Sequence, residues 1–494
     1  MRNTTILALI IVLGTMVCFA DGWQRTYGGT NGDGGKSVVQ TSDGGYIIAG
    51  YTGSFGDGDY DIYLVKTDAI GDTEWTRTYG GSDNDCAYSV EQTTDGGYIL
   101  AGYSGPYDYH DVYIVKTTST GDVQWTKTYG GVQNDEAYSV MQTADGGYFV
   151  AGYSESFDDG AWGDVYVLKL NSSGDTVWTH TYGGIDVDIA YSAKQTSDGG
   201  YILAGYTNSF YTGSIYLIKI TASGDVEWSQ NYDGDVAYSV AQTSDGGYIL
   251  AGWIDYADYD IYIIKTNSSG DIEWTKIYGG SDEEDASSII NTADGGFLVV
   301  GYTMSFGAGD EDVYILKLDS SGDTIWTRTY GGSDDDEAYS VMQTSDGGYI
   351  IAGYTYSFGA GYDDIYLIKT DSLGEVSWVS EPNIKPQTIN ISAYPNPFNS
   401  SVKITAPADA EIEIYDAKGN VVYKPPLFSN SFLPEEKGEP MGAQSQSPSP
   451  WGEGYRMRGL FIWTPDKTVS SGIYLVRITS EDGLNQIKRI VYLK

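Results

Sequence analysis

Histidine, cysteine and basic residues are all scarce in this sequence. Its 494 residues include two histidines and two cysteines, and 27 lysines and arginines stand against 68 aspartates and glutamates, for a formal net charge of −41. This acidic excess argues against nucleic acid and anionic membrane surfaces as partners, because both bind basic patches. It permits cations, cationic partners or neutral sugars as ligands, and it also keeps a protein soluble.

Proline is nearly absent from most of the chain and then becomes frequent. Pro106 is the only one of 13 prolines before Val379. From Val379 to the end, 12 basic and 12 acidic residues cancel, which leaves 15 basic and 56 acidic residues in 1–378. Two parts of different construction therefore meet near Ser380.

The first 20 residues have the pattern of a secretory signal peptide. An arginine precedes an apolar run from Ile6 to Ala20, which is shorter than the roughly 20 residues that a membrane-spanning helix needs. We therefore expect export, cleavage after Ala20 and no membrane span in the mature protein. Cys86 is then the only cysteine, so no intrachain disulfide forms and packing or bound ions must supply the stability.

Tryptophan marks a repeat with a period near 50 residues, which is typical of solenoids, propellers and arrays. No unit has a helical stripe, and each has four short β-type runs. The last unit, for example, has runs at Ala338–Thr344, Tyr349–Thr355, Asp364–Thr370 and 376–380. Four strands fill one propeller blade, whereas a β-helix coil needs a much shorter period. The marking residues are Trp23, Trp75, Trp125, Trp178, Trp228, Trp274, Trp326 and Trp378.

The phrase SDGGYIIAGY occurs at Ser42–Tyr51 and again at Ser345–Tyr354. We expect Asp43 to accept backbone hydrogen bonds in a turn, and Gly44 or Gly45 to adopt a positive φ. The residues after the turn alternate between two apolar faces, as in a blade with a neighbour on each side. The phrase therefore specifies a fold and is not an active site.

The first three runs occur seven times and the tryptophan run eight times, which suits a ring closed by a strand from one terminus. Either Trp23 or Trp378 could supply that strand. We predict a seven-bladed β-propeller over residues 21–380. This region resembles the DGGY-type β-propeller repeats of secreted bacterial and archaeal proteins, and the resemblance implies a fold but almost nothing about activity.

The C-terminal part has alternating strands with Gly and Asn turns, which predict a small Ig-like β-sandwich over 387–494 after a linker at 381–386. Three motifs in it, YPNPF at 394–398, GIYLV at 472–476 and KRIVYLK at 488–494, resemble a type IX secretion C-terminal sorting domain. The resemblance implies the secretion machinery as partner, transport across an outer membrane, and a cargo attached to the bacterial cell surface or released.

One stretch departs from that family pattern. Residues 424–459 are rich in Pro, Ser, Gly and Glu and show no strand period, so we expect a disordered insertion. It either weakens sorting or lies harmlessly in a surface loop.

No catalytic constellation is evident. His110 and His180 occupy non-equivalent positions, Cys86 has acidic neighbours that should raise the pKa of its thiol, and no nucleophile, zinc or phosphate-loop motif occurs. One lysine recurs per unit, and we expect it at a wet rim of the ring. These lysines are Lys66, Lys116, Lys169, Lys219, Lys265, Lys317 and Lys369.

The acidic loops are the feature of the sequence that points most clearly to a function. In an up-and-down blade the fourth-to-first and second-to-third connections leave on one side, so one face collects these carboxylates together with aromatic residues. Clustered carboxylates suit Ca²⁺, and aromatic rings could stack on sugars; a solvated acidic face is the alternative. Trp162 and Trp253 are ligand-binding candidates, Trp253 beside a notch left by the short loops of the fifth unit. The calcium candidates are Asp83, Asp85, Asp282, Asp285, Asp334 and Asp336.

Three hypotheses follow for function. The first is an exported, surface-displayed or released propeller that binds a glycan, a matrix component or a protein without turning it over. The second is an extracellular carbohydrate-active enzyme that uses carboxylates of the acidic face as acid and base. The third is a structural spacer. A buried carboxylate pair in a funnel, with a raised pKa, would favour the enzyme, and evenly solvated loops would favour binding.

Overall fold

The computed structural model describes residues 22–106, 109–157, 162–210, 213–255 and 259–376, together with eight strands between Ser392 and Tyr492. The signal peptide at 1–20, Trp378 and the linker at 381–386 lie outside the described residues. The chain divides into two compact units, 1–380 and 381–494. Among the described residues, no helix is long and apolar enough to span a membrane.

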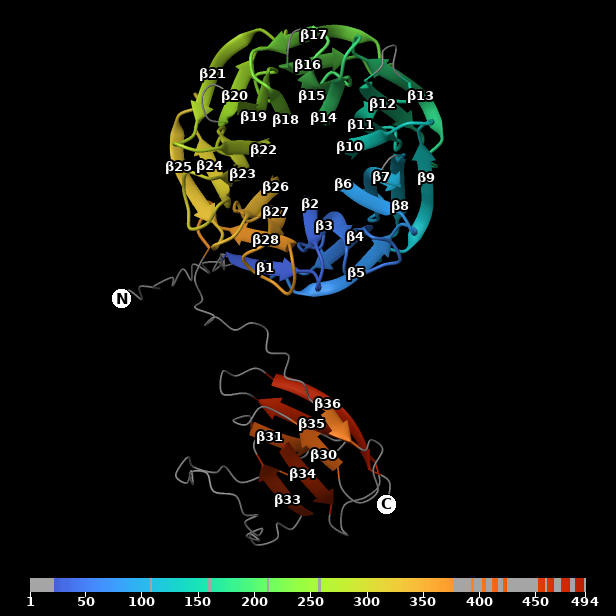
Figure 1. Ribbon diagram of the computed structural model, residues 1–494, viewed down its shortest axis with the longest axis vertical. Helices are drawn as coiled ribbons and strands as arrows, with labels where there is room; N and C mark the ends of the chain where they lie inside the picture. Colours follow the sequence, from blue (N-terminus) through green and yellow to red (C-terminus); the bar gives the residue numbers. More distant parts are fainter. Residues whose placement is uncertain are drawn as a thin grey trace, which may run out of the picture. The chain divides into compact units, whose positions relative to one another are not determined.

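The first unit is a ring of seven four-stranded antiparallel sheets (Figure 1), which confirms the predicted seven-bladed propeller. The first strand of each blade lines the central channel. These strands are β2 (Asp33–Gln40), β6 (Asn84–Gln92), β10 (Asp135–Gln142), β14 (Asp188–Gln195), β18 (Val236–Gln242), β22 (Glu284–Asn291) and β26 (Asp336–Gln343). The second strands are β3 (Tyr46–Thr52), β7 (Tyr98–Gly105), β11 (Tyr148–Ser154), β15 (Tyr201–Thr207), β19 (Tyr248–Ile254), β23 (Phe297–Thr303) and β27 (Tyr349–Thr355).

The third and fourth strands lie progressively farther from the channel. The third strands are β4 (Asp61–Thr67), β8 (Asp111–Thr117), β12 (Asp164–Leu170), β16 (Ser214–Ile220), β20 (Asp260–Thr266), β24 (Asp312–Leu318) and β28 (Asp364–Thr370). The fourth strands are β5 (Thr73–Tyr79), β9 (Val123–Tyr129), β13 (Thr176–Tyr182), β17 (Val226–Tyr232), β21 (Ile272–Tyr278), β25 (Thr324–Tyr330) and β1 (Trp23–Tyr27).

The N-terminal strand closes the ring. β1 pairs antiparallel with β28, with Trp23 opposite Lys369 and Tyr27 opposite Ile365, and so completes the blade that the C-terminal end of the unit begins. Trp23 is buried and lies edge-on to Tyr46, with ring centroids 5.8 Å apart. The choice between the two terminal tryptophan strands, which the sequence left open, therefore falls on Trp23.

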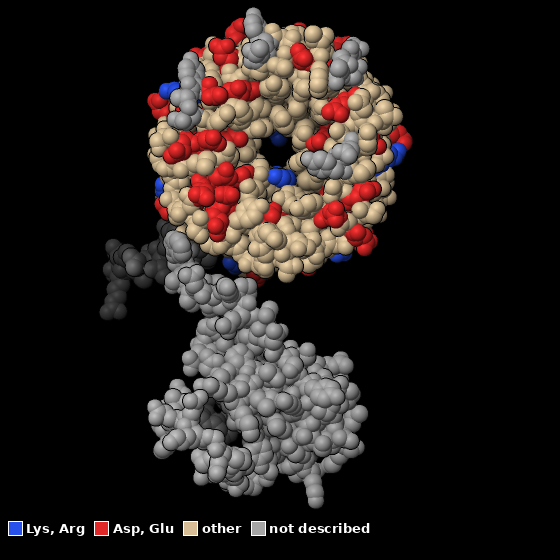
Figure 2. All heavy atoms as spheres, viewed as in Figure 1, with Lys and Arg blue, Asp and Glu red and all other residues tan. Residues whose placement is uncertain are grey.

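The ring has two different faces. The connections from fourth to first strands and from second to third strands leave on one side, which we call the loop face. They contact each other there: the Gly53 amide donates to the Gly32 carbonyl at 2.7 Å, and the Asn31 amide donates to Ser54 Oγ at 2.9 Å. Figure 2 shows acidic side chains gathered on this face around the open central channel. The DGG turns lie on the opposite side, the turn face.

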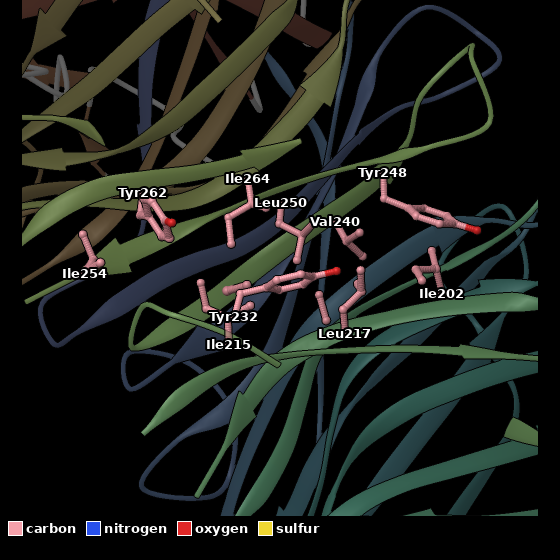
Figure 3. Packing of buried hydrophobic residues seen from close by; sticks show 12 residues of the cluster. Ile202, Ile215, Leu217, Tyr232, Val240, Tyr248, Leu250, Ile254, Tyr262 and Ile264 are labelled. Atoms are coloured by element: carbon pink, nitrogen blue, oxygen red, sulfur yellow. The ribbon is translucent and has the colours of Figure 1, made fainter. Parts of the chain in front are cut away.

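The hydrophobic core lies between blades, because each blade packs both faces against a neighbour. Figure 3 shows one junction, where Ile202, Ile215 and Leu217 of one blade meet Val240 and Leu250 of the next, all fully buried. Burying each such side chain contributes about 1.5–3 kcal/mol. The alternation predicted for the strand after the DGG turn is confirmed: Tyr46 and Ile48 pack in one junction, and Ile47 and Ala49 in the adjacent one.

The DGG turn is built as the sequence predicts, and it also holds a lysine. Asp43 Oδ1 accepts the Gly45 amide at 3.0 Å, and Gly44 has φ +89°. A Cβ on Gly45 would lie 2.1 Å from the Thr67 carbonyl oxygen, so only glycine fits there. Lys66 lies under the turn, with its Nζ 3.0 Å from Asp43 and 2.8 Å from the Thr67 carbonyl oxygen.

The same lysine–aspartate pair occurs in every blade, and the lysines are 1–8% exposed. The expectation that they occupy a wet rim is therefore wrong, because each lysine bends under its own DGG turn. In one blade the hydrogen bonds from Thr143 and the Gly147 amide, with Lys169, lower the pKa of Asp145 to about 2. That interaction is fully present above the pKa of an unfolded aspartate, about 4, and is lost as the pH falls toward 2.

The second unit contains two four-stranded antiparallel sheets, consistent with the small sandwich predicted for it. One sheet has the order β29 (Ser392–Tyr394), β30 (Val402–Thr405), β34 (Leu460–Pro465), β33 (Gly452–Met457), and the other β32 (Val421–Tyr423), β31 (Glu411–Tyr415), β35 (Gly472–Thr479), β36 (Asn485–Tyr492). β33 lies inside the stretch 424–459 for which we predicted no strand. The prolines of that stretch end at Pro450, so from Gly452 every backbone amide can donate to a ladder. Residues 424–451 lie outside the described residues.

Candidate functional site

The six calcium candidates fall into three different environments. Asp85 and Asp336 are fully buried at the starts of their blades, where each Oδ2 accepts a loop amide, from Gly81 at 2.8 Å and from Gly332 at 2.7 Å. These two side chains therefore fix the backbone of the loops that precede them on the loop face. They are structural caps of the kind that Asp often provides in turns.

Asp83, Asp282 and Asp334 are exposed on the loops themselves. Among the described residues, no group of three or more His, Cys, Asp or Glu side chains is arranged to hold a metal ion. Asp285 lies apart from the other five candidates, because its side chain points into the central channel.

The channel encloses a cavity of about 440 Å³. Its wall comes from the first strands, where an AYS motif recurs. Four tyrosines follow one another around the wall with ring centroids 5.0 Å apart, and a fifth stands in the last blade. We call these five the tyrosine belt: Tyr88, Tyr138, Tyr191, Tyr238 and Tyr339.

The belt is broken at two of its seven positions. In the first blade the tyrosine is replaced by Lys36, whose Nζ lies 3.4 Å from the ring centroid of Tyr339. In the sixth blade it is replaced by Ser287, which leaves a gap in the aromatic wall. Asp285 and Ser287 of the same strand both line the cavity, and a β-bulge at Ser287 interrupts the regular alternation of side chains there.

Asp285 and Glu337 line the cavity on the loop-face side of this position, and Glu311 hydrogen-bonds Glu337; we call these three residues the channel mouth. Burial and the nearby Glu337 raise the pKa of Asp285 to about 7, against a hydrogen bond from the Ala286 amide. Burial and a hydrogen bond with Glu337 raise the pKa of Glu311 to about 8. Near neutral pH the mouth therefore holds protons that ordinary carboxylates would have lost.

The aromatic candidates contribute differently. Trp162 is 60% exposed beside its loop, and its carbonyl accepts the Tyr153 hydroxyl at 3.0 Å. Trp253 is half-buried, stacks edge-on with Tyr259 at 5.0 Å, and hydrogen-bonds Tyr238 of the belt. Trp253 therefore supports the channel wall.

The histidines and the cysteine lie apart from any shared site. His110 Nε2 lies 2.8 Å from Glu136 Oε1, and His180 packs against Trp178 on the outer strand. Burial raises the pKa of the Cys86 thiol to about 12. The sequence suggested a raised value but for a different reason, since burial outweighs the acidic neighbours.

Sequence reasoning identified only Asp285 of the channel residues. Glu311 and Glu337 lie in the acidic loops but were not separated from their neighbours there. The sequence signal that distinguishes these two blades is the break in the AYS motif, with GKS at Gly35–Ser37 and ASS at Ala286–Ser288.

The carboxylates of the channel mouth should make the protein less stable as the pH rises. An acid whose folded pKa is raised binds more protons folded than unfolded, so unfolding becomes easier between pH 5 and pH 8. We expect the free energy of unfolding to fall by a few kcal/mol over this range, and by about half as much in Asp285→Asn. Urea unfolding at both pH values measures it, with Asp282→Asn as control. Equal slopes in wild type and Asp285→Asn would contradict the assignment.

Comparison with known families finds a match for part of the second unit. Residues 392–432 match the secretion system C-terminal sorting domain. The tail is a type IX sorting domain. It accounts for the YPNPF motif at 394–398, and it marks the chain as a secreted bacterial protein that is attached to the cell surface. A search of curated proteins finds no match.

Solved structures resemble the chain only distantly. The match to a fungal alcohol oxidase covers 96% of this chain and 99% of the oxidase chain, with 11% identity and a TM-score of 0.46. The match to Sqt1 from Chaetomium thermophilum covers 70% of this chain and all of that protein, with 12% identity and a TM-score of 0.40. The match to a protein of unknown function from Dyadobacter fermentans covers 70% of this chain and 98% of that protein, with 11% identity and a TM-score of 0.42. None of these likenesses carries an argument about function.

Proposed function

We propose that this exported propeller is a non-catalytic binding module, and that its ligand enters the central channel from the loop face. The observation that supports it is the cavity of about 440 Å³, where an aromatic wall, a gap at Ser287 and the carboxylates of the channel mouth meet. Concave sites with aromatic walls and a few convergent polar groups are typical of ligand binding. The sorting domain supports display at the cell surface, where such a module serves adhesion to a glycan, a matrix or a protein.

The variant Ser287→Tyr tests the channel as the binding site. It restores the residue that five other blades have, so the fold should tolerate it while the new ring fills the gap. We expect wild-type full chain to be retained on at least one of immobilised dextran, chitosan and alginate, and Ser287→Tyr to lose at least 90% of that retention. Asp334→Asn, on an exposed loop, should keep it. Retention on none of the three, or retention unchanged by Ser287→Tyr, would favour the structural spacer.

A second candidate is the carbohydrate-active enzyme, and the raised pKa of Glu311 favours it. A protonated carboxylic acid beside ionised carboxylates is what a general acid requires. Glu311 and Glu337 themselves touch through a hydrogen bond, closer than the roughly 5–9 Å that separates the two carboxyl groups of glycosidases. Asp285 would then have to act with one of them. Release of reducing ends from dextran or chitosan, abolished by Glu337→Gln, would establish this activity.

A further inference from the structure

Within the described residues no ion pair neutralises the acidic groups of the channel mouth, and Lys36 acts on Glu337 only from beyond ion-pair distance. None of the ion pairs in the described part of the chain involves Asp285, Glu311 or Glu337. Asp285 Oδ1 is buried there without a hydrogen-bond partner. Burying an ionised carboxylate without a partner is costly, so a cation in this place would stabilise the ionised form.

The channel already holds an amine of its own. Lys36 Nζ lies 3.4 Å from the ring centroid of Tyr339 and forms no ion pair within the described residues. An ammonium over an aromatic face is attracted by the ring quadrupole, more strongly when it is desolvated. Lys36 therefore shows that the tyrosine belt accepts an ammonium group, on the side of the ring next to the gap.

The gap offers a second place of the same kind. Ser287 lacks the ring that five other blades have at this position, and Asp285, Glu337 and Tyr302 line the cavity together with it. The carboxylates supply hydrogen-bond acceptors for N–H donors, and the tyrosine rings supply apolar faces for the attached carbon skeleton. The hydroxyls of a neutral sugar could donate to the carboxylates but would not neutralise their charge, and an anion would be repelled.

Resting on the proposed binding function, we infer that the channel mouth binds a protonated primary amine at the gap beside Ser287. The amine can belong to an alkyl polyamine or to an amino sugar, since both present the same ammonium group. Two cations line the cavity, Lys36 and Lys194, and Lys194 stands three residues farther along its strand than the belt position Tyr191, away from the loop face. The amine is therefore drawn to the mouth and not to the far end.

Binding is coupled to protons. The carboxyl of Glu311 faces Glu337, Asp335 and Glu283, and that of Asp285 faces Glu337 and the Ala286 amide. Three tyrosines also face these two carboxyls, Tyr302, Tyr238 and Tyr354, and Lys36 acts on Glu337. Acids predominate, so an arriving ammonium favours the ionised forms of Asp285 and Glu311 and expels protons. Affinity for a ligand that stays charged throughout must consequently rise from pH 6 to pH 8.

Calorimetric titration of the full chain tests the inference with three probes: spermidine, a glucosamine trimer with free amines, and the same trimer fully N-acetylated. We expect at least one amine probe to bind and the N-acetylated trimer to bind at least tenfold more weakly than the free trimer, or not at all. The amines of spermidine resemble that of lysine and stay charged over this pH range. If the ligand is an alkyl polyamine, spermidine should therefore bind about tenfold tighter at pH 8 than at pH 6. Binding of spermidine alone identifies an alkyl polyamine, and binding of the free trimer alone identifies an amino sugar.

Variants separate the mouth from the general acidity of the face. Asp285→Asn and Glu311→Gln should each weaken amine binding at least tenfold, and Ser287→Tyr should abolish it. Asp282→Asn and Asp334→Asn remove the same charge from exposed loops and should change the affinity less than twofold. Equal losses in both pairs, equal binding of the N-acetylated trimer, or binding of neither amine would overturn the inference. Retention on dextran that is lost in Ser287→Tyr would then leave the binding function standing with a different ligand.

Discussion

Replacing Asp294 by asparagine is expected to lower the free energy of unfolding by about 2–3 kcal/mol. Asp294 is the only described carboxylate paired with Lys317, at 3.0 Å, and Lys317 is 2% exposed with a further hydrogen bond to the Leu318 carbonyl at 3.0 Å. Asparagine keeps the acceptor for the Gly296 amide but removes the charge. The cost is therefore that of leaving a buried ammonium without its counter-ion, and chemical denaturation of the full chain measures it.

The matched control is Asp323→Asn. Asp323 forms an ion pair of similar length with Lys276, at 2.9 Å, but both side chains are exposed, so its loss should cost less than about 1 kcal/mol. In Asp294→Asn combined with Lys317→Met, much of the stability should return, because the unpaired charge is gone. Equal effects of Asp294→Asn and Asp323→Asn would show that the lysines under the DGG turns are not electrostatically buried.

Replacing Trp23 by alanine is expected to cost about 3–5 kcal/mol. Trp23 is the buried end of the strand that closes the ring, and Gly71 packs against its ring, since a Cβ there would lie 2.7 Å from it. Tyr27 at the other end donates to the Gly71 carbonyl at 2.6 Å. Loosening β1 exposes the edge of β28 and the junction between the last and first blades. Thermal unfolding of the full chain should show the loss directly.

Trp378→Ala provides the comparison, since both tryptophans occupy the same place in the repeat. Because the edge of β28 is already taken by β1, we expect a change below about 1 kcal/mol. A larger effect of Trp378→Ala than of Trp23→Ala would mean that the C-terminal copy closes the ring in solution.

Much of the ring could be predicted because the same local sequence pattern recurs seven times. The turn geometry of Asp43 and Gly44, the two apolar faces and the blade count all follow from interactions within about ten residues or from counting. The place of Lys66 did not follow, because its partner Asp43 lies 23 positions earlier and meets it only across the folded blade. A charged residue in an apolar strand was assigned to the surface by the usual preference of lysine.

The site was harder, because the acidic loops look alike in the sequence. Whether a carboxylate caps a loop, faces solvent or enters the channel depends on its position relative to the first ladder residue of β6, β22 or β26. Glu284 caps its loop, since its Oε2 accepts the Gly280 amide at 2.6 Å, whereas Asp285, one residue later, lines the channel. Neighbouring strand residues point to opposite sides, so a shift of one residue separates the two roles. The closing strand was undecidable for a related reason: Trp23 and Trp378 are equivalent in the repeat, and only pairing distinguishes them.

An amine bound at the mouth beside Ser287 would be visible in a crystal structure of the full chain grown with spermidine or the glucosamine trimer. We expect an ammonium between Asp285 and Glu337, with the attached carbons against the tyrosine belt. Ligand bound only along exposed residues such as Asp282 and Asp334, with the gap beside Ser287 empty, would contradict it.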